Sequence, residues 1–584
     1  MKFDRPIKWR DFPEKTKILF FIHRCQEMLY RYTIEKYRMP VLNTHQLVKE
    51  YCSVVVQVEK EVIKPEFAEK IQEEFIDTLK TDYAIKYGWG ELNAEYFIEQ
   101  WGKLSNPEKR KQMFYLRDIL AKGTYLKWCK NALYHACSAN INYAKLENIC
   151  RSIVPELIAL GYSVDYLYHK IQNILKSKIV SAEDFFNFMD SFNLKSSEHR
   201  VYIGISKKYP EIIDVLIRRF NCTSEDDGYF GKFKLRRDCQ LICFQEIRAL
   251  DEYSAMSWAM YKIEIFIKFF GLLSNKHAPM IQKYGMVKTE NSEELFFVET
   301  RRKELNIIFE LEDKDAISIA ENSISTLLKN IPIRQFSLLE RAIDLHNAAL
   351  SVQDYRNSFL NLWSIFETII TPEKGKSKIE RIIEVVSNVL KCDWLDNVLI
   401  DLDKNLKCNI PDKYNELLVL VNDDTAHSSV EKLIHIIYDD KYEDIRKSLY
   451  SELSDFPVIS YRINKFHKDF EKPNGITKEI TKYCRRVGWH LYRLYLTRNL
   501  IVHSGQRPKH IQILSEHLHY YVDALLLEII YAFIKKPNIA SIENVLTEIM
   551  FKNQVFESQI KSISETTSQN VLAILEWDVN LLKN

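Results

Sequence analysis

Glycine and proline are scarce in this chain, whose 584 residues include 14 Gly and 15 Pro. Because these residues mark most turns and hairpins, their scarcity excludes a fold built chiefly from short strands and tight loops. Long apolar runs are also missing, since the most apolar stretch, 254–273, contains Lys262, Glu264 and Lys268. A membrane-spanning helix needs about 20 consecutive apolar residues, so we expect no membrane contact.

Paired cysteines and a targeting segment are lacking as well. The 11 cysteines are an odd number without a Cys-x-x-Cys pair, and the closest two are Cys239 and Cys243. No histidine pair flanks them at zinc-finger spacing. Residues 1–10 are charged and have no apolar core of signal-peptide length. These features predict reduced thiols in a cytoplasmic protein.

The remaining residues favour a mainly α, multi-domain protein, because 584 residues are too many for a single core. Residues 1–194 show helical periodicity with aromatic-rich faces, which predicts a helical N-terminal domain, a candidate sensor or regulator. The sequence pattern changes in residues 195–330, which contain β-prone runs near 200–206 and 295–300. Together with a long helical pattern over 251–273, these runs predict a small α+β module.

Residues 331–584 are expected to form a C-terminal helical bundle. The chain returns to long periodic helical segments at 337–370, 378–391, 476–504, 510–535 and 540–558.

Positive charge is concentrated in one part of a chain whose formal net charge is only +2. Residues 474–510 contain eight Lys or Arg against one acid, Glu479. Such a run either binds a polyanion or forms a helix face paired with acids elsewhere. On the first alternative the RNA-binding residues are Lys482, Arg485, Arg486 and Arg493.

The segment 491–505 combines Arg498, Asn499 and His503 in a strongly apolar helical pattern that ends at Ser504 and Gly505. An arginine can neutralise a phosphate, and a histidine can transfer protons near neutral pH. Together at one helix end, these residues suggest phosphodiester chemistry on RNA without a metal ion.

The Arg-x4-His spacing alone is weak evidence. It occurs four times, at Arg341/His346, Arg462/His467, Arg485/His490 and Arg498/His503. Helical context distinguishes the last, because Asn499 and His503 lie about 40° apart on one face. Apolar residues on two sides of this helix predict burial in a core or between subunits.

An arginine in such a helix needs an anionic partner. Glu367, on the polar stripe of the apolar segment 359–370, is the candidate. Two interpretations stay open: a catalytic group, or a structural ion pair with His503 as a helix cap.

These residues resemble a known family. The stretch 498–505 (RNLIVHSG) is similar to the Arg-x4-His signature of HEPN domains, in the Asn-containing form of Apea-like HEPN proteins. The stretch 362–367 (LWSIFE) resembles the early helix of that family with its acidic residue, and 515–521 (SEHLHYY) resembles the following helix. The resemblance covers about 336–535.

The resemblance implies a dimerising helical bundle that acts as a metal-independent endoribonuclease with no cofactor. It implies a homodimer or higher homo-oligomer in which two motifs face each other. It also implies catalytic roles for Arg498 and His503, with Asn499 as the intervening polar residue and Glu367 as support.

Two functions are therefore weighed. The first is an antiphage-defence or toxin effector that cleaves RNA, with transfer RNA as a candidate substrate, restrained by its N-terminal half until a trigger such as a phage product acts. The second is a non-catalytic interaction protein whose HEPN-like domain only dimerises. A nucleotide-binding regulator ranks last, because no complete glycine-rich phosphate loop is present.

Overall fold

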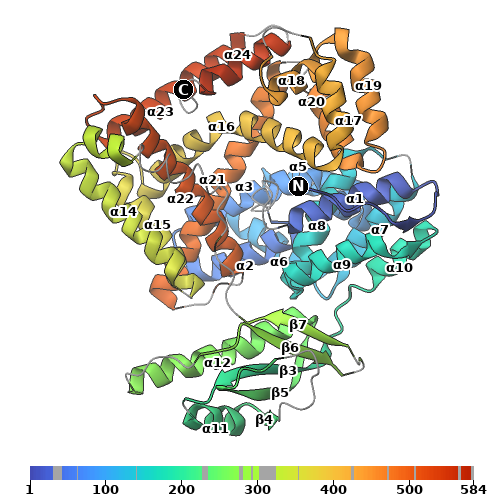
Figure 1. Cartoon of the computed structure of the whole chain (residues 1–584), viewed down its shortest axis with the longest axis vertical. Helices are drawn as coiled ribbons and strands as arrows, with labels where there is room; N and C mark the ends of the chain where they lie inside the picture. Colours follow the sequence, from blue (N-terminus) through green and yellow to red (C-terminus); the bar gives the residue numbers. More distant parts are fainter. Residues whose placement is uncertain are drawn as a thin grey trace.

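The computed structural model describes the chain except for residues 31–41, 62, 140, 209, 226–233, 275–279, 291, 293, 301–304, 306–323, 353, 423–425, 470–472, 506–507, 509, 563–566 and 580–584. Helices predominate, and a five-stranded antiparallel sheet lies in the middle region, which confirms the predicted fold class. Figure 1 shows a large helical body with the sheet module below it.

The N-terminal part is helical. Its helices are α1 (Lys15–Leu29), α2 (Thr44–Glu59), α3 (Glu66–Thr81), α4 (Tyr83–Trp89), α5 (Glu91–Trp101), α6 (Asn106–Leu120), α7 (Thr124–Ser138), α8 (Tyr143–Leu160), α9 (Val164–Lys176) and α10 (Ala182–Asp190). Strands β1 (Lys8–Trp9) and β2 (Lys178–Ile179) form a short parallel pair. Local sequence sets several ends: Asn43 and Gln46 form a capping box at α2, and Gly161, at φ 119°, ends α8.

The middle module is a sheet with two helices. Its elements are β3 (Ser197–Ser206), α11 (Pro210–Arg219), β4 (Cys222–Glu225), β5 (Cys239–Ala249), α12 (Glu252–Ser274), β6 (Tyr284–Thr289) and β7 (Leu295–Glu299). The strand order is β4-β5-β3-β6-β7, and every pairing is antiparallel. From β3 to β6 this is the split β-α-β-β-α-β arrangement, extended by β7 at one edge.

The C-terminal part is again helical. Its elements are α14 (Ile333–Ser351), α15 (Tyr355–Ile369), α16 (Lys378–Asn409), α17 (Pro411–Val419), α18 (Ser429–Tyr438), the 3₁₀ turn η3 (Asp440–Tyr442), α19 (Glu443–Glu452), α20 (Pro457–Asp469), α21 (Pro473–Ser504), α22 (Ile511–Lys535), α23 (Ile542–Ser562) and α24 (Ser568–Val579). The predicted single segment 337–370 is two helices, because the Asp354 side chain accepts a hydrogen bond from the Arg356 backbone N–H and starts α15.

The hydrophobic cores divide the helical part differently from the predicted boundaries. One continuous core joins the N-terminal helices to the segment 394–480 and to α24. A second core is formed by α14, α15, the first part of α16, and much of α21, α22 and α23. The predicted unit 331–584 is therefore split between two cores, whereas the sheet module has hydrophobic clusters of its own.

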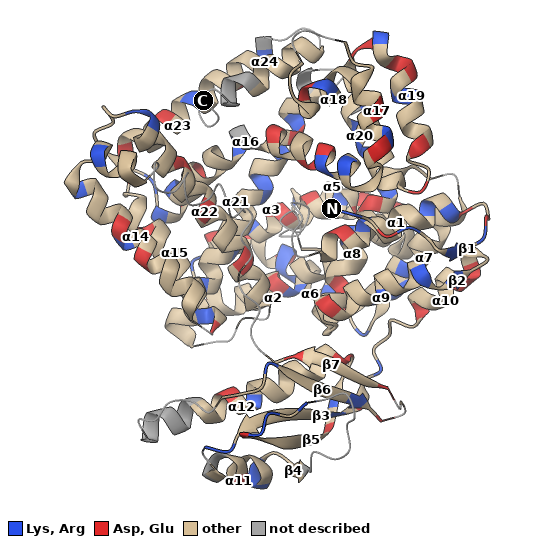
Figure 2. Ribbon diagram, viewed as in Figure 1, with Lys and Arg blue, Asp and Glu red and all other residues tan. Residues whose placement is uncertain are grey.

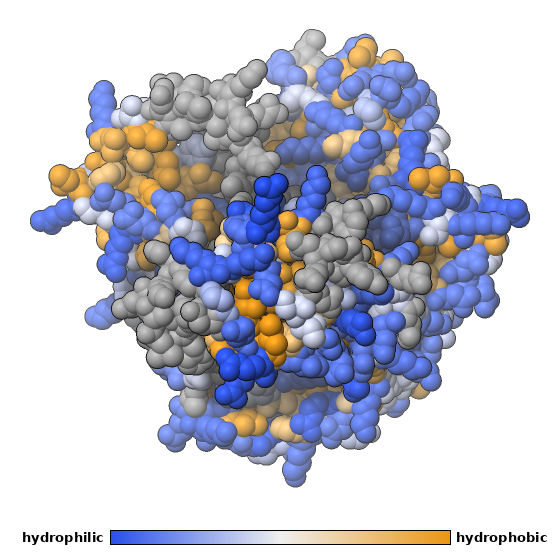
Figure 3. Space-filling model, turned by 60° about the horizontal axis from the view of Figure 1, so that its bottom comes forward, coloured by the Kyte–Doolittle hydropathy of each residue, from blue (hydrophilic) through white to orange (hydrophobic). Residues whose placement is uncertain are grey.

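Charge and hydropathy vary over short distances. Figure 2 shows Lys and Arg alternating with Asp and Glu over the helical body. Seen from the side of the sheet module, the surface is mostly hydrophilic with separate hydrophobic areas (Figure 3). Contrary to the expectation that 254–273 is the most apolar stretch, helix α22 is the described helix that is long and apolar enough to cross a membrane by length and composition, but 61% of its most apolar window is buried inside the protein.

Candidate functional site

The candidate site lies near the C-terminal end of α21. This helix stops at Ser504, and the next residue, Gly505, adopts a left-handed backbone at φ 59°. A glycine at this position ends helices because the conformation is strained for residues with a Cβ atom. The sequence therefore places His503 in the last turn of α21.

Arg498 and Glu367 form the predicted ion pair, with Arg498 Nη2 3.4 Å from Glu367 Oε1. The same carboxylate oxygen accepts a hydrogen bond of 3.2 Å from the indole N–H of Trp363, one turn earlier on α15. Asn499 accepts a hydrogen bond of 3.2 Å from Arg498 Nη1. Both side chains of the ion pair keep about a quarter of their surface exposed, 25% for Arg498 and 27% for Glu367. A charged guanidinium is thus held in place while solvent still reaches it.

His503 lies apart from this cluster. It is exposed, and it makes no hydrogen bond or ion pair with the described residues. Five helical positions separate it from Arg498, which corresponds to roughly 7.5 Å along the axis and about 140° of rotation. The neighbouring Val502 is 49% exposed. One chain thus gathers Arg498, Asn499 and Glu367, and presents His503 to solvent at the end of the same helix.

Arg493 does not lie on an exposed basic face, so the prediction that it contacts RNA is corrected. Its side chain is 8% exposed and lies against α2 and α3. Arg493 donates to both carboxylate oxygens of Glu50, at 2.8 and 2.9 Å, and to Glu74 at 2.6 Å. Burial raises the pKa of Glu74 to about 7, and the charge of Arg493 opposes this rise. These contacts satisfy a buried arginine and join α21 to the N-terminal helices.

Arg486 and Lys482 also face the N-terminal helices. Burial, followed by the nearby charge of Arg151, lowers the pKa of Arg486 to about 10. Burial, followed by the charge of Arg486, lowers the pKa of Lys482 as well. Arg486 lines a polar pocket with Arg24 and Arg151. Much of the predicted basic run thus faces other helices of the protein. This agrees with the alternative that these residues pair with acids elsewhere in the chain.

Arg485 is the more accessible member of the predicted RNA-binding set. Its side chain is 50% exposed, pairs with Asp77 of α3 at 2.6 Å, and lies over the ring of Trp489 at 5.1 Å. Two further basic residues of the run, Arg507 and Lys509, lie outside the described residues.

The aromatic residues Trp489, Tyr492 and Tyr495 of α21 are buried or half-buried against neighbouring helices. Tyr495 stacks on Phe67 of α3 at 5.6 Å between ring centroids and on Trp363 of α15 at the same distance. Tyr492 contacts the edge of Phe67 at 6.1 Å. Trp489 is 6% exposed. These three aromatic residues therefore serve in packing between helices.

Sequence reasoning missed a second polar cluster, formed by His346 of α14 with His519 and Asp523 of α22. His346 appears in the sequence only as part of another Arg-x4-His match. The available signal was the His-x3-Asp spacing of 519 and 523, which puts both side chains on one face of a helix.

Comparison of the chain with protein-family models, with curated proteins and with solved structures gives no match in any of the three.

Proposed function

We propose that this chain is a metal-independent endoribonuclease that cleaves RNA by attack of a 2′-hydroxyl on the adjacent phosphate. The observation that supports it most is the partly exposed guanidinium of Arg498, held by Glu367 near the helix end that presents His503. A phosphate is the natural counter-ion for such a guanidinium, and RNA carries its own nucleophile beside each phosphate.

Each residue has a defined role in this proposal. Arg498 binds the non-bridging phosphate oxygens and stabilises the charge that develops on them. Glu367 and Trp363 restrict the Arg498 side chain to its reactive orientation. His503 transfers protons, a contribution of about 10²–10⁴-fold. The 2′-oxygen forms a bond to phosphorus as the bond to the 5′-oxygen breaks, leaving a 2′,3′-cyclic phosphate and a protonated 5′-hydroxyl.

The separation of Arg498 from His503 supports a site shared between two copies of the chain. A second α21 end would bring the histidine of one subunit towards the arginine of the other. Two histidines would then divide the work, one removing the proton from the 2′-hydroxyl and the other protonating the leaving oxygen. The exposed Val502 offers apolar surface for this contact.

Regulation by the N-terminal half is part of the proposal and is supported by the contacts of α3. One side of α3 holds α21 through Phe67 and Glu74. Its other side, with Ala68 and Gln72, lines an apolar cavity together with α2 and α6. A trigger bound in that cavity would shift α3 and thereby the helix that carries Arg498. This arrangement suits a toxin or antiphage effector that must stay silent until activated.

The direct test is cleavage of RNA, transfer RNA included, by the full chain in the presence of EDTA. We expect Arg498→Ala and His503→Ala each to lower the cleavage rate by about 10²-fold or more. Exposed His427 offers a matched control, because His427→Ala removes a surface histidine that lies outside α21. Equal cleavage by native protein and both variants would contradict the assignment.

The competing function is that of a non-catalytic dimer. The ion pair between Arg498 and Glu367 favours it, because an arginine paired with a carboxylate within one chain can also serve a purely structural role. In that case no preparation cleaves RNA. Arg498→Ala would then weaken self-association, which sedimentation velocity measures as a shift from dimer to monomer.

A further inference from the structure

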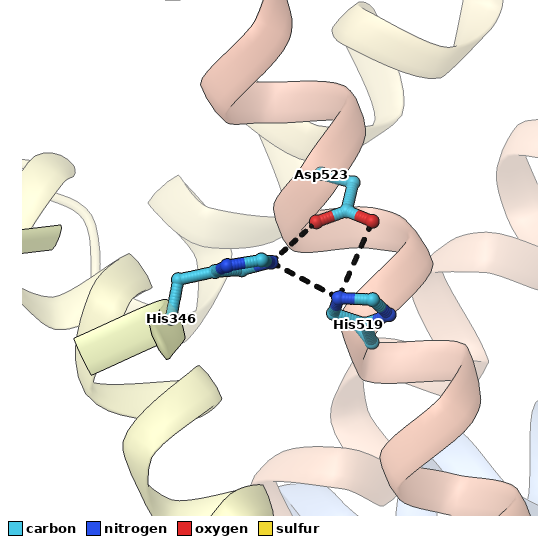
Figure 4. A group of neighbouring side chains, drawn as sticks. All are labelled: His346, His519 and Asp523. Carbon is cyan, nitrogen blue, oxygen red and sulfur yellow. Dashed lines mark hydrogen bonds and ion pairs between the residues drawn. The ribbon is translucent and has the colours of Figure 1, made fainter. Parts of the chain in front are cut away.

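Three side chains that can ligate a metal ion converge between α14 and α22. His346 projects from α14 toward His519 and Asp523, which lie one turn apart on α22 (Figure 4). His346 Nε2 is 3.0 Å from His519 Nε2 and 2.8 Å from Asp523 Oδ1. His519 Nε2 is 3.4 Å from Asp523 Oδ2. Each of the three groups therefore contacts both of the others.

Hydrogen bonds satisfy this arrangement poorly when Asp523 is ionised. If both Nε2 atoms carry a proton, two N–H groups face each other at 3.0 Å. If only one carries a proton, the lone pair of the other imidazole faces a carboxylate oxygen, at 2.8 Å for His346 or 3.4 Å for His519. Two of these proton assignments place like groups 2.8 or 3.0 Å apart, and the third, with the proton on His346, leaves a 3.4 Å contact between lone pairs. A cation bound by the three residues is attracted to the lone pairs of all of them.

The spacing and chemistry of these atoms fit a divalent transition-metal ion. Ligands about 2.0–2.1 Å from a zinc ion, at angles of about 90–110°, are separated from one another by roughly 2.8–3.4 Å. The separations of 2.8, 3.0 and 3.4 Å, two of which end on different carboxylate oxygens of Asp523, lie within that range. Two imidazoles and one carboxylate are typical zinc ligands and a poor set for Mg²⁺ or Ca²⁺.

The cluster of His346, His519 and Asp523 is buried on one side and open to solvent on the other. The side chain of His519 is 1% exposed, whereas His346 and Asp523 are 21% and 14% exposed. Water can therefore complete the coordination shell of an ion from the solvent side.

We propose that His346, His519 and Asp523 form a binding site for a divalent transition-metal ion, with Zn²⁺ as the best-matched ion. The ion links α14 to α22 and so holds together two helices of the second hydrophobic core. None of the three residues belongs to the Arg498 cluster, so this inference is independent of the proposed nuclease function. An ion bound only by the native state stabilises the fold through mass action.

The experiment is calorimetric titration of Zn²⁺ into chelator-treated full-length protein, with Co²⁺ absorption as a second readout. We expect one tight Zn²⁺-binding event, a visible Co²⁺ spectrum of imidazole–carboxylate coordination, and no comparable binding of Mg²⁺. Asp523→Asn keeps the side-chain shape and should weaken Zn²⁺ binding on the order of 100-fold. His346→Asn serves as a second variant at a more exposed position.

The matched control is Asp439→Asn, directly after the end of α18, where Asp439 lies 2.8 Å from His435 of that helix with the same spacing along the chain. This variant should bind Zn²⁺ like the native protein. Absence of tight Zn²⁺ binding, or equal binding by native protein and Asp523→Asn, would overturn the site. RNA cleavage measured in EDTA reports separately on the nuclease proposal, since chelation removes the ion without touching Arg498 or His503.

Discussion

Buried and exposed histidines serve different physical purposes in this chain. His503 is exposed at a helix end, where solvent reaches its ring. His23 lies fully inside the core, where its ring stacks on Phe456 and its Nε2 lies 3.1 Å from the Asp4 carbonyl oxygen. Burial lowers the pKa of His23 to about 4, and the Asp4 carbonyl opposes this effect. A histidine held neutral in this way makes stability depend on pH.

We predict that His23→Gln reduces the acid sensitivity of the fold. In the unfolded chain this histidine binds a proton below pH of about 6.5, whereas in the native protein it does so only below about 4. The unfolded state therefore binds more protons between pH 6.5 and 4, and stability falls as pH falls through that window. The cost reaches about 3 kcal/mol at the acid end.

Urea denaturation at pH 7 and pH 4.5 measures this effect. His23→Gln should lose markedly less stability between the two values than the native protein, and the exposed His427→Gln should lose as much as the native protein. An unchanged pH dependence in His23→Gln would show that other groups control acid stability.

At the scale of elements, α21 is held from two sides. Tyr495 packs between Trp363 of α15 and Phe67 of α3, and Arg493 joins the carboxylates of α2 and α3. The Arg498–Glu367 pair could be predicted from sequence, because each residue is a polar exception in an apolar helix. The partners of Arg493 could not, because Glu50 and Glu74 lie 443 and 419 residues away. Helical periodicity shows which residues share a face and leaves unknown which distant face covers it.

Loss of the Arg493 guanidinium should strongly destabilise the contact between α21 and α3. Arg493→Ala leaves the carboxylates of Glu50 and Glu74 buried without their shared cation, at a cost of about 3–5 kcal/mol. Arg485→Ala is the matched control, because its half-exposed pair with Asp77 joins the same two helices and contributes less than about 1 kcal/mol. Thermal and urea unfolding of both variants measure the difference.

The cleavage assay extends this comparison. If the proposed nuclease activity exists and α3 restrains it, the fraction of Arg493→Ala protein that stays folded should cleave RNA faster than native protein. Arg485→Ala should cleave RNA at the native rate. Equal stability of the two variants would mean that the buried network contributes little to holding α21.

At the scale of the whole molecule, the sequence predicts the helical class and the α+β module but not how the helices share cores. The runs near 200–206 and 295–300 appear as β3 and β7, and the helix predicted over 251–273 appears as α12. The hydrophobic pattern of 394–480 does not show how the helices of this segment pack. In particular, the pattern does not show that these helices pack against the N-terminal helices, with which they form one continuous core.

This distribution of cores predicts which fragments fold alone. A fragment of residues 331–584 exposes the surface on which the N-terminal helices pack, so it should lack cooperative unfolding and should aggregate. A fragment of residues 195–300 keeps its sheet, both helices and its own apolar clusters. Its described contacts with the body include the hydrogen bond of 2.7 Å from the Ser163 backbone N–H to Asp251. We expect this module to unfold cooperatively in isolation, as circular dichroism with thermal melting would show. A compact, cooperatively folded 331–584 fragment would mean that its two groups of helices do not depend on the N-terminal half.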